Sequence, residues 1–376
     1  MIYFHIPFCK QACHYCDFHF TTSLKYKSEI LQALKDEITL RNHYLQDQNI
    51  HSIYFGGGTP SLLSADEIKA LIDYVAKYFV LAHDAEITLE ANPDDLNLQK
   101  VQSLKNTPIN RFSIGIQSFF EEDLRWMNRA HNSTEAETAI KTVQDAGFQN
   151  VTADLIYGYP LLTNEKWQSN IAKLVDFSIP HISSYAMTIE AKTALAHFIK
   201  QGKTAPIQDS QSAVQMTMLI EALSSQGYDH YEISNFAKNQ KYAKHNTNYW
   251  LGKHYLGIGP SSHSFNGLSR HWNISNNAKY IEGIKNEKPF AESENLSFYD
   301  RINEYLMTSL RTMWGISLNT IQNNFGQDVL QHIAKQITPF IATKDVQMIE
   351  NHYTLTNKGK LLADHIASEL FLIEDD

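Results

Sequence analysis

The sequence predicts an α/β fold with parallel strands, and three observations support this prediction. Six short segments are rich in Ile, Tyr, Phe, Val and Thr and lack a long helical period. Segments with apolar residues three and four apart separate them. Polar residues recur where the strand segments end. Such alternation implies βαβ units, with ligands at the carboxyl ends of the strands, whether the sheet is open and doubly wound or forms a barrel.

The individual elements follow from these patterns in chain order. Ser64 and Glu67 form a capping-box pattern at the start of one helix, and Thr134 with Glu137 offers the same pattern at the start of another. The expected helices of this region span 26–45, 64–79, 133–148 and 207–226. The expected strands span 2–6, 52–58, 86–92, 111–117, 151–158 and 182–189.

Three regions are expected along the chain. Residues 1–237 hold the alternating strands and helices, and residues 238–294 form a connecting segment that is rich in Asn, His, Tyr and Trp. Residues 295–376 return to a helical pattern and end in a hairpin and a helix, which is typical of a small winged-helix-like domain. Its expected helices span 298–312, 317–324 and 327–342, followed by strands at 346–350 and 352–356 and a helix from Lys358.

The charge, the apolar runs and the cysteine count of the sequence argue against several classes of function. The formal net charge of -9 argues against bulk binding to nucleic acid or to an anionic membrane surface. No apolar run approaches the ~18–20 residues of a membrane span, and the N-terminus has no signal-like pattern. Three cysteines cannot build a disulfide framework. A cytoplasmic location is therefore expected.

The three cysteines form a motif with a specific chemistry. Cys9, Cys13 and Cys16 are spaced as Cys-x3-Cys-x2-Cys directly after the first expected strand. Three thiolates can hold three irons of a 4Fe–4S cluster and leave the fourth iron open to bind a substrate or cofactor. Two alternatives remain open from the residues alone. One is a structural zinc with a nearby histidine as fourth ligand, and the other is three buried thiols without a metal.

The cysteine spacing resembles that of the radical S-adenosylmethionine (SAM) superfamily. Further segments resemble the oxygen-independent coproporphyrinogen III oxidase family and, more narrowly, its heme-chaperone branch. This resemblance implies a partial (β/α)6 radical SAM barrel over 1–237, in which the open iron chelates SAM and one electron cleaves it to methionine and a 5′-deoxyadenosyl radical. The segments are "YFHIPFC" (3–9), "YFGGGTPS" (54–61), "EANP" (90–93), "NRFSIGIQSF" (110–119), "DLIYGYP" (154–160), "YEISNFA" (231–237), "HNTNYW" (245–250), "LRTMWGI" and "YTLTNKGKLLADHI".

The resemblance also implies roles for single residues. Cys9, Cys13 and Cys16 would ligate the cluster. Chemically, Glu90 can accept from an ammonium or a ribose hydroxyl, and Arg129 can bind a carboxylate. The residues expected to lie at SAM are Tyr3, Tyr15, Gly58, Thr59, Glu90, Gln117, Arg129, Asp154 and Ala186.

Three features separate the chaperone branch from the oxidase. The oxidase carries a further cysteine two places after the third, where this chain has Phe18, and an extension ahead of the first strand, where this chain begins at Met1. Both departures weaken the oxidase interpretation. In "HNTNYW", His245 is a candidate axial ligand of heme iron, and the two aromatic residues offer flat surface for a porphyrin. His263 is either a second candidate ligand or a histidine packed in a glycine-rich turn, and we expect the turn.

The leading hypothesis is a radical-SAM-type heme chaperone that binds heme and a 4Fe–4S cluster and delivers heme to apo-hemoproteins. Through these acceptors it would contact membranes only peripherally, and the resemblance implies a homodimer on cluster loading. The alternative is an enzyme, a SAM-dependent coproporphyrinogen III oxidase that performs oxidative decarboxylation in heme biosynthesis. A third interpretation is an iron–sulfur or zinc module without a role toward heme.

Overall fold

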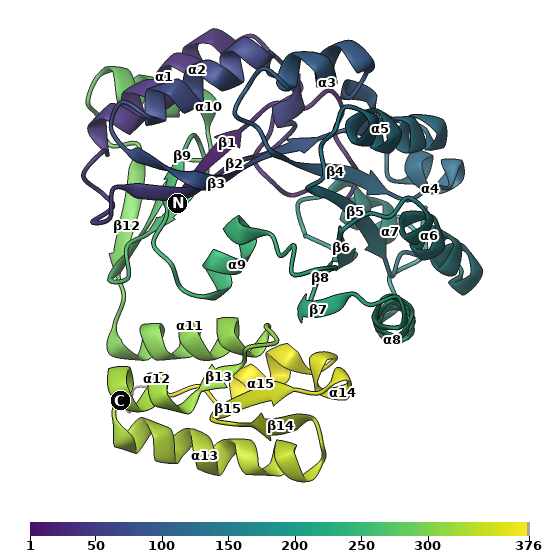
Figure 1. The fold of residues 1–376 in the computed structure, drawn as a ribbon, viewed down its shortest axis with the longest axis vertical. Helices are drawn as coiled ribbons and strands as arrows, with labels where there is room; N and C mark the ends of the chain where they lie inside the picture. Colours follow the sequence, from purple (N-terminus) through teal and green to yellow (C-terminus); the bar gives the residue numbers. More distant parts are fainter. Residues whose placement is uncertain (374–376) are drawn as a thin grey trace.

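The computed structural model describes residues 1–373, and its largest unit is a nine-stranded curved sheet (Figure 1). The strands lie in the order β7-β8-β6-β5-β4-β3-β2-β1-β9. Strands β1 to β6 pair in parallel, which confirms all six expected strands and gives the partial barrel. Their bounds are β1 (Ile2–Ile6), β2 (Asn49–Gly57), β3 (Val80–Ala91), β4 (Arg111–Gln117), β5 (Val151–Tyr157) and β6 (His181–Ala186).

Three further strands complete this sheet at its edges. β9 (Leu256–Ile258) pairs in parallel with β1, so the expected connecting segment also supplies a barrel strand. At the opposite edge, β8 (Asn235–Ala237) and β7 (Asp229–Glu232) run antiparallel. The sheet therefore does not close on itself.

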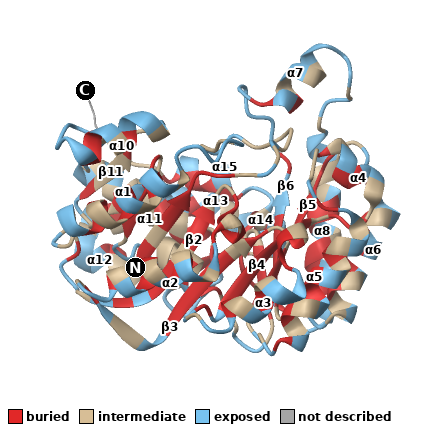
Figure 2. Ribbon diagram, turned by 90° about the horizontal axis from the view of Figure 1, so that it is seen from above, coloured by how far each residue is buried: buried red, intermediate tan, exposed pale blue. Residues whose placement is uncertain are grey.

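Helices cover the convex face of the sheet, while α9 (Lys244–Trp250) lies on its concave side (Figure 1). The expected helices at 26–45, 64–79, 133–148 and 207–226 are confirmed as α1, α2, α5 and α8. The covering helices are α1 (Lys27–Leu40), α2 (Ala65–Val75), α3 (Leu98–Leu104), α4 (Glu121–Trp126), α5 (Ser133–Asp145), α6 (Asn164–Asp176) and α8 (Asp209–Ser225). α7 (Ala194–Lys200) projects away from the sheet (Figure 2), and the Leu195 amide donates to His14 O of the cysteine loop at 2.8 Å.

One of the two predicted helix caps is confirmed and one is wrong. The Ser64 side chain accepts from the Glu67 amide, and Glu67 accepts from the Ser64 amide. At α5 the cap is Asn132 with Glu135, two residues before the predicted Thr134. Both registers contain a capping pattern, but the chain leaves its extended conformation at Asn132, and Asn caps a helix at least as well as Thr.

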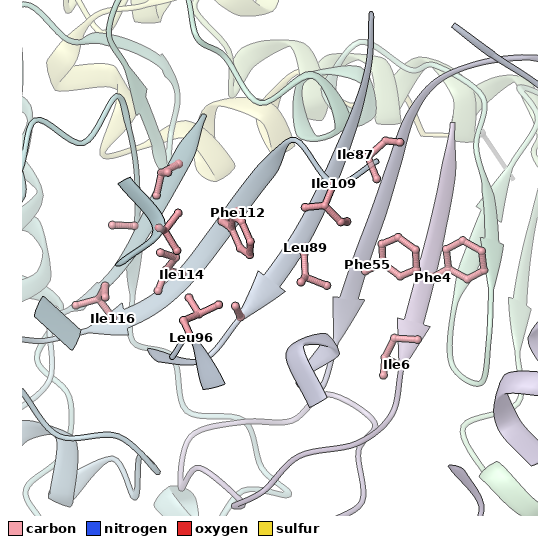
Figure 3. Packing of buried hydrophobic residues seen from close by; sticks show 14 of the residues in the cluster. Phe4, Ile6, Phe55, Ile87, Leu89, Leu96, Ile109, Phe112, Ile114 and Ile116 are labelled. Atoms are coloured by element: carbon pink, nitrogen blue, oxygen red, sulfur yellow. The ribbon is translucent and has the colours of Figure 1, made fainter. Parts of the chain in front are cut away.

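The residues of the strands alternate between an apolar layer and a polar layer. Phe4, Phe55, Leu89 and Phe112 are fully buried side chains from four neighbouring strands, and they lie in one row in Figure 3. The rings of Phe4 and Phe55 stack with centroids 4.9 Å apart. Figure 2 shows that burial is concentrated in these strands. The alternate positions carry polar side chains, so the opposite face of the sheet can hold a polar ligand.

A second group of elements follows the barrel strands. α10 (Asn277–Lys285) packs against α1, and a small antiparallel sheet consists of β10 (His263–Phe265), β11 (Ser269–Asn273) and β12 (Ala291–Asn295). His263 was expected to pack in a glycine-rich turn, and this prediction is wrong. The residue begins β10 and is exposed, and its ring stacks on Trp272 at 6.4 Å across the pairing with β11. No helix within residues 1–373 is long and apolar enough to cross a membrane.

The C-terminal part has a hydrophobic cluster of its own, drawn from residues 302–372. All three expected helices and both expected strands are present. Residues 374–376, the end of the predicted C-terminal domain, lie outside the described residues, and the domain boundaries at 237 and 294 stay a prediction. The elements are α11 (Phe298–Leu310), β13 (Ile316–Ser317), α12 (Leu318–Phe325), α13 (Gln327–Ala342), β14 (Val346–Ile349), β15 (His352–Leu355), α14 (Asn357–Lys360) and α15 (Ala363–Glu369).

Candidate functional site

A cavity of about 560 Å³, here named the central cavity, lies at the carboxyl ends of the parallel strands. The strand ends and the loops that follow them supply its wall, as expected for a barrel. All but two of the residues that the sequence predicted for the site line it, and the two that do not are Tyr3 and His245. Those that line it are Cys9, Cys13, Tyr15, Cys16, Gly58, Thr59, Glu90, Gln117, Arg129, Asp154 and Ala186.

The loop that carries the cysteines is held by backbone hydrogen bonds. The Cys9 amide donates to Thr21 O at 3.0 Å, and the Thr59 amide donates to Phe8 O at 2.6 Å. A Cβ added to Gly58 would lie 2.6 Å from Phe8 O and 3.0 Å from Cys9 Sγ. Gly58 therefore allows the loop after β2 to approach the cysteine loop, a role beyond the contact with SAM that the sequence suggested.

The cysteine loop is also anchored by charge. Lys10, which follows the first cysteine, forms ion pairs with Asp94, at 2.7 Å, and with Asp95. Both acids belong to the short helix η2 (Pro93–Asp95), which follows β3. On the other side of the loop, the His14 amide donates to Met127 O at 3.1 Å. The position of the three thiols is thus determined by contacts from β2, β3 and α4.

Arg129 connects the thiols with the rest of the cavity wall. Its Nη1 donates to Cys13 Sγ and to Tyr15 Oη, each at 3.4 Å, and its Nη2 donates to Asn92 Oδ1 at 2.8 Å. Its Nε is buried and has no partner among the described residues. A partly buried guanidinium beside a thiol suits an anionic cluster and the carboxylate of SAM.

The donor set fits the cluster and the cofactor that the sequence implies. Burial raises the pKa of the Cys16 thiol to about 12 and also raises the pKa of Cys9, so iron binding, which requires thiolates, would release protons. No three His, Cys, Asp or Glu side chains within residues 1–373 are grouped around one metal position. A 4Fe–4S cluster places each thiolate on a separate iron atom.

Two carboxyl groups lie on the wall that β3 and β5 contribute. Tyr54 Oη donates to Glu90 Oε1 at 2.7 Å, and Ser113 Oγ donates to Asp154 at 3.3 Å. Burial, opposed by these hydrogen bonds, raises the pKa of Glu90 and of Asp154 to about 7. Both groups can accept hydrogen bonds from an ammonium or from ribose hydroxyls once they are ionised.

Gln117 enters the cavity through an irregularity at the end of β4. Its φ is +65°, and the register between β4 and β5 shifts between Ile114 and Gln117. Such a shift turns the strand and redirects the side chain, which is a common device beside functional sites. A backbone in this conformation is strained for a residue other than Gly, Asn or Asp.

Tyr3 lies behind the cavity wall. Its ring stacks on the ring of Tyr54 at 6.1 Å, and Tyr54, which the sequence reasoning did not select, lines the cavity in its place. A Cβ on Gly56 would lie 2.9 Å from a ring carbon of each tyrosine and 3.2 Å from Glu90 Oε1. Gly56 is therefore required for this packing, and the contact of Tyr3 with SAM stays a prediction.

His245 is buried in α9 and both of its ring nitrogens are hydrogen-bonded. Its Nδ1 is 2.9 Å from Ser52 Oγ, and its Nε2 is 2.9 Å from Tyr249 Oη. Burial lowers the pKa of His245 to about 3, so the ring is neutral at pH 7. The contact with Tyr249 must break before Nε2 can bind iron.

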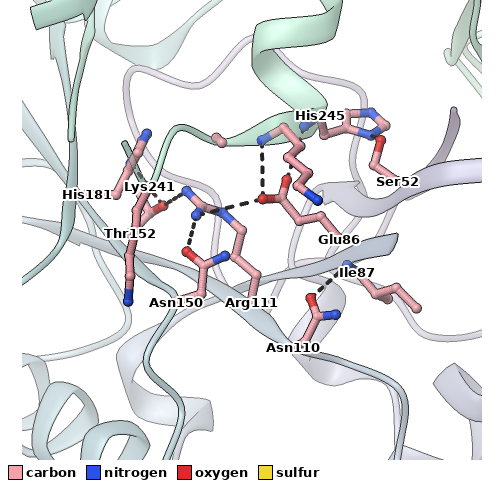
Figure 4. Close-up of polar contacts among 12 residues, drawn as sticks. Ser52, Glu86, Ile87, Asn110, Arg111, Asn150, Thr152, His181, Lys241 and His245 are labelled. Atoms are coloured by element: carbon pink, nitrogen blue, oxygen red, sulfur yellow. Dashed lines mark hydrogen bonds and ion pairs between the residues drawn. The ribbon is translucent and has the colours of Figure 1, made fainter. Parts of the chain in front are cut away.

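Polar side chains of the barrel hold the start of α9 (Figure 4). Glu86 accepts from the amides of His245, at 3.0 Å, and Lys244, at 3.1 Å. Arg111 is 4.0 Å from Glu86, and both side chains are almost fully buried. The guanidinium of Arg111 also donates to Asn150 and Thr152. α9 is thus part of the cavity wall, to which Ala243 and Asn246 contribute.

Most of the cavity residues that the sequence reasoning missed lie inside strands, because it considered mainly the strand ends; Asn92 and Asn246 lie outside the strands. Along β4, Arg111, Ser113 and Gly115 alternate with apolar residues. Along β5, Thr152 and Asp154 alternate with apolar residues in the same way. Polar residues at every second position of an otherwise apolar strand indicate a polar interior. The missed residues at the cavity include Tyr54, Asn92, Arg111, Ser113, Thr152, Ser183, Tyr185 and Asn246.

Comparison with known proteins agrees with this site. Residues 3–174 match the radical SAM superfamily, and residues 296–362 match the HemN C-terminal domain. Heme chaperone HemW of Lactococcus lactis is 30% identical and is aligned over 99% of this chain and 97% of its own length. HemW of Haemophilus influenzae is 31% identical, with 100% and 98% covered.

Among solved structures, coproporphyrinogen III oxidase (HemN) from Escherichia coli has a TM-score of 0.84 at 22% identity, with 98% of this chain and 89% of that chain covered. This likeness shows the fold of the barrel and the C-terminal domain. The 4Fe–4S cluster and SAM follow from the superfamily, and the cysteine loop and the acids of the central cavity fit them. On the whole-chain identity to the HemW proteins, this chain belongs to the HemW heme chaperone family within the radical SAM superfamily.

Proposed function

We propose that this protein binds heme and a 4Fe–4S cluster and delivers the heme to apo-hemoproteins in the cytoplasm. The observation that carries the proposal is the position of the "HNTNYW" helix, α9, whose residue Asn246 lines the same cavity as the three cysteines. The whole-chain likeness to the HemW chaperones supports it. His245 would be the axial ligand of the heme iron, since a neutral imidazole binds iron well.

Heme ligation by His245 requires a local rearrangement. Nε2 is bonded to Tyr249, and the ring of Trp250 lies under the guanidinium of Arg311 at 5.1 Å. Heme would therefore bind to a conformation in which the Tyr249 side chain has turned away from Nε2 and α9 has moved away from β2, against which the ring of His245 is buried. Tyr249 and Trp250 would then offer their faces to the porphyrin.

A heme titration, followed by the Soret absorbance, tests this role of His245. We expect His245→Ala to weaken heme binding at least tenfold, whereas the exposed His43→Ala should bind like the wild-type protein. Because the ring of His245 is buried, a second variant is informative. Tyr249→Phe frees Nε2 without removing the ring, and we expect it to bind heme at least as tightly as the wild type. Equal affinity of His245→Ala and wild type would reject His245 as the ligand.

Coproporphyrinogen III oxidation is the second candidate activity, and the fold likeness to the oxidase favours it. Against it, Phe18 occupies the position expected for the further cysteine of the oxidase, where it is 66% exposed at the cavity. An anaerobic assay with the cluster-loaded protein, SAM and a reductant separates the two functions. Formation of protoporphyrinogen by repeated turnover would replace the chaperone proposal with an enzymatic one.

The remaining partners are proposed with the function. The acceptors would be apo-hemoproteins, some of them at the membrane, and the protein would form a homodimer once the cluster is loaded. Size-exclusion chromatography with light scattering, before and after anaerobic cluster reconstitution, tests the homodimer. Iron and sulfide analysis of the same samples tests the metal, because about four irons per chain would exclude a zinc module.

A further inference from the structure

We propose that Tyr54 couples SAM in the central cavity to the position of α9, so that bound SAM weakens heme binding at His245. Tyr54 is a positioning residue in this account. It contacts a carboxylate of the cavity with its hydroxyl and the histidine of α9 with its ring. The heme part of this inference rests on the proposed function, whereas the coupling between the cavity and α9 does not.

The contacts of Tyr54 form a direct connection between the two sites. Its hydroxyl donates to Glu90 Oε1 at 2.7 Å. Its ring lies 5.1 Å from the ring of His245, at an interplanar angle of 32°. The ring of Tyr3 stacks on the ring of Tyr54 at 6.1 Å and also lies 6.5 Å from the ring of His245. A side chain packed in this way moves little unless one of its neighbours moves as well.

The cavity wall also depends on α9 directly. Ala243 and Asn246 line the central cavity, so this part of the wall exists only while α9 is packed on the barrel. Arg111 lines the cavity too, and through Glu86 it is linked to the first amides of α9 (Figure 4). A ligand that fills the cavity therefore contacts a surface that the displaced α9 would not provide.

These contacts decide the direction of the coupling. SAM would bind more tightly to the packed arrangement, because that arrangement completes the wall and keeps Tyr54 on Glu90. Heme would bind to the displaced arrangement, because the ring of His245 is 1% exposed while it packs on Ser52 and Tyr54 of β2, and iron can reach it only after α9 moves. Two ligands that favour different conformations weaken each other, and the factor is the same in both directions. Filling the cavity would thus release heme.

Amide hydrogen exchange of residues 243–250 tests the coupling without heme. The probe is SAM without a reductant, added at saturation to the full, cluster-loaded protein under anaerobic conditions. In the wild type we expect SAM to slow exchange of this segment by about fivefold or more, the lower end of typical allosteric coupling. In Tyr54→Phe, which removes only the hydroxyl, we expect less than about a twofold change. Tyr54→Leu, which removes the ring as well, should behave in the same way.

Tyr26→Phe is the control for the loss of a tyrosine hydroxyl. Tyr26 is 37% exposed at the start of α1 and does not line the central cavity. We expect this variant to keep the wild-type response. Heme titration with and without SAM completes the test: SAM should raise the heme Kd of the wild type and of Tyr26→Phe by about the factor seen in exchange.

The outcomes separate the coupling from the proposed function. An unchanged exchange rate in the wild type, or a full response in Tyr54→Phe, would overturn the role of Tyr54. A heme Kd that SAM leaves unchanged or lowers would overturn the stated direction. A wild-type exchange response that Tyr54→Phe loses, in a protein that binds no heme, would leave the coupling intact and reject the chaperone function.

Discussion

The buried pair of Arg111 and Glu86 gives a quantitative test of how the barrel is stabilised. The side chains are 1% and 4% exposed, and Nη1 and Oε2 are 4.0 Å apart. Arg111→Met removes the cation that pairs with the almost fully buried carboxylate of Glu86. Removal of one partner of a buried pair costs about 3–5 kcal/mol. Because Glu86 keeps two backbone donors from α9, we expect the lower end, about 3 kcal/mol.

Urea unfolding followed by circular dichroism and by tryptophan fluorescence measures this cost, provided that the slope m stays unchanged. Arg270→Met is the control. Its ion pair with Glu304 is shorter, 2.7 Å, but the two side chains are 31% and 27% exposed. We expect a loss of about 1 kcal/mol or less there. Equal losses in the two variants would refute the reasoning, because they would show that burial does not decide the strength of these pairs.

Three further predictions follow from the central cavity. Cys13→Ser should lower the iron content of reconstituted protein well below that of the wild type, measured by iron and sulfide analysis, whereas the matched surface change Ser225→Ala should not. Burial raises the pKa of Glu90 and Asp154 to about 7 from ordinary values of 4.5 and 3.8, so the protonated forms favour folding. The free energy of unfolding of the ligand-free protein should therefore fall as the pH rises from about 4 to 7, with a shallower slope in Glu90→Gln. Gly56→Ala should cost about 1–3 kcal/mol in urea unfolding, because its Cβ would lie 2.9 Å from Tyr3 and Tyr54; an unchanged midpoint would show that the two rings move freely.

Sequence reasoning predicted the elements better than their contacts. Hydrophobic periodicity and composition depend only on residues that are close in sequence, so they were enough to locate the parallel strands and the helices of the C-terminal part. β9 could not, because Leu256–Ile258 is only three residues long and is a strand only by pairing with β1. The cap of α5 was misplaced because two capping patterns overlap, and the structure uses the one formed by Asn132 and Glu135.

The same holds for the candidate site: the positions of its residues could be predicted better than their contacts. Residues at strand ends could be predicted, because parallel strands bring their carboxyl ends together whatever the loops do. The role of Gly56 could not, since it depends on the rings of Tyr3 and Tyr54, which meet it across the paired strands β1 and β2. Likewise, the motif predicted His245 as a heme ligand, but nothing in the motif indicates that Ser52 occupies the other ring nitrogen.

The geometry of α9 explains why one short motif can respond to several ligands. An isolated helix of seven residues is not stable in water, so its conformation depends on what it contacts. His245 contacts the barrel, Asn246 faces the central cavity, and Trp250 packs against Arg311 of the C-terminal part. Three different environments thus hold one element that has little stability of its own. A ligand that changes any of these contacts would therefore act on the other two, and the heme site proposed on this helix would be sensitive to SAM without any direct contact between the two ligands.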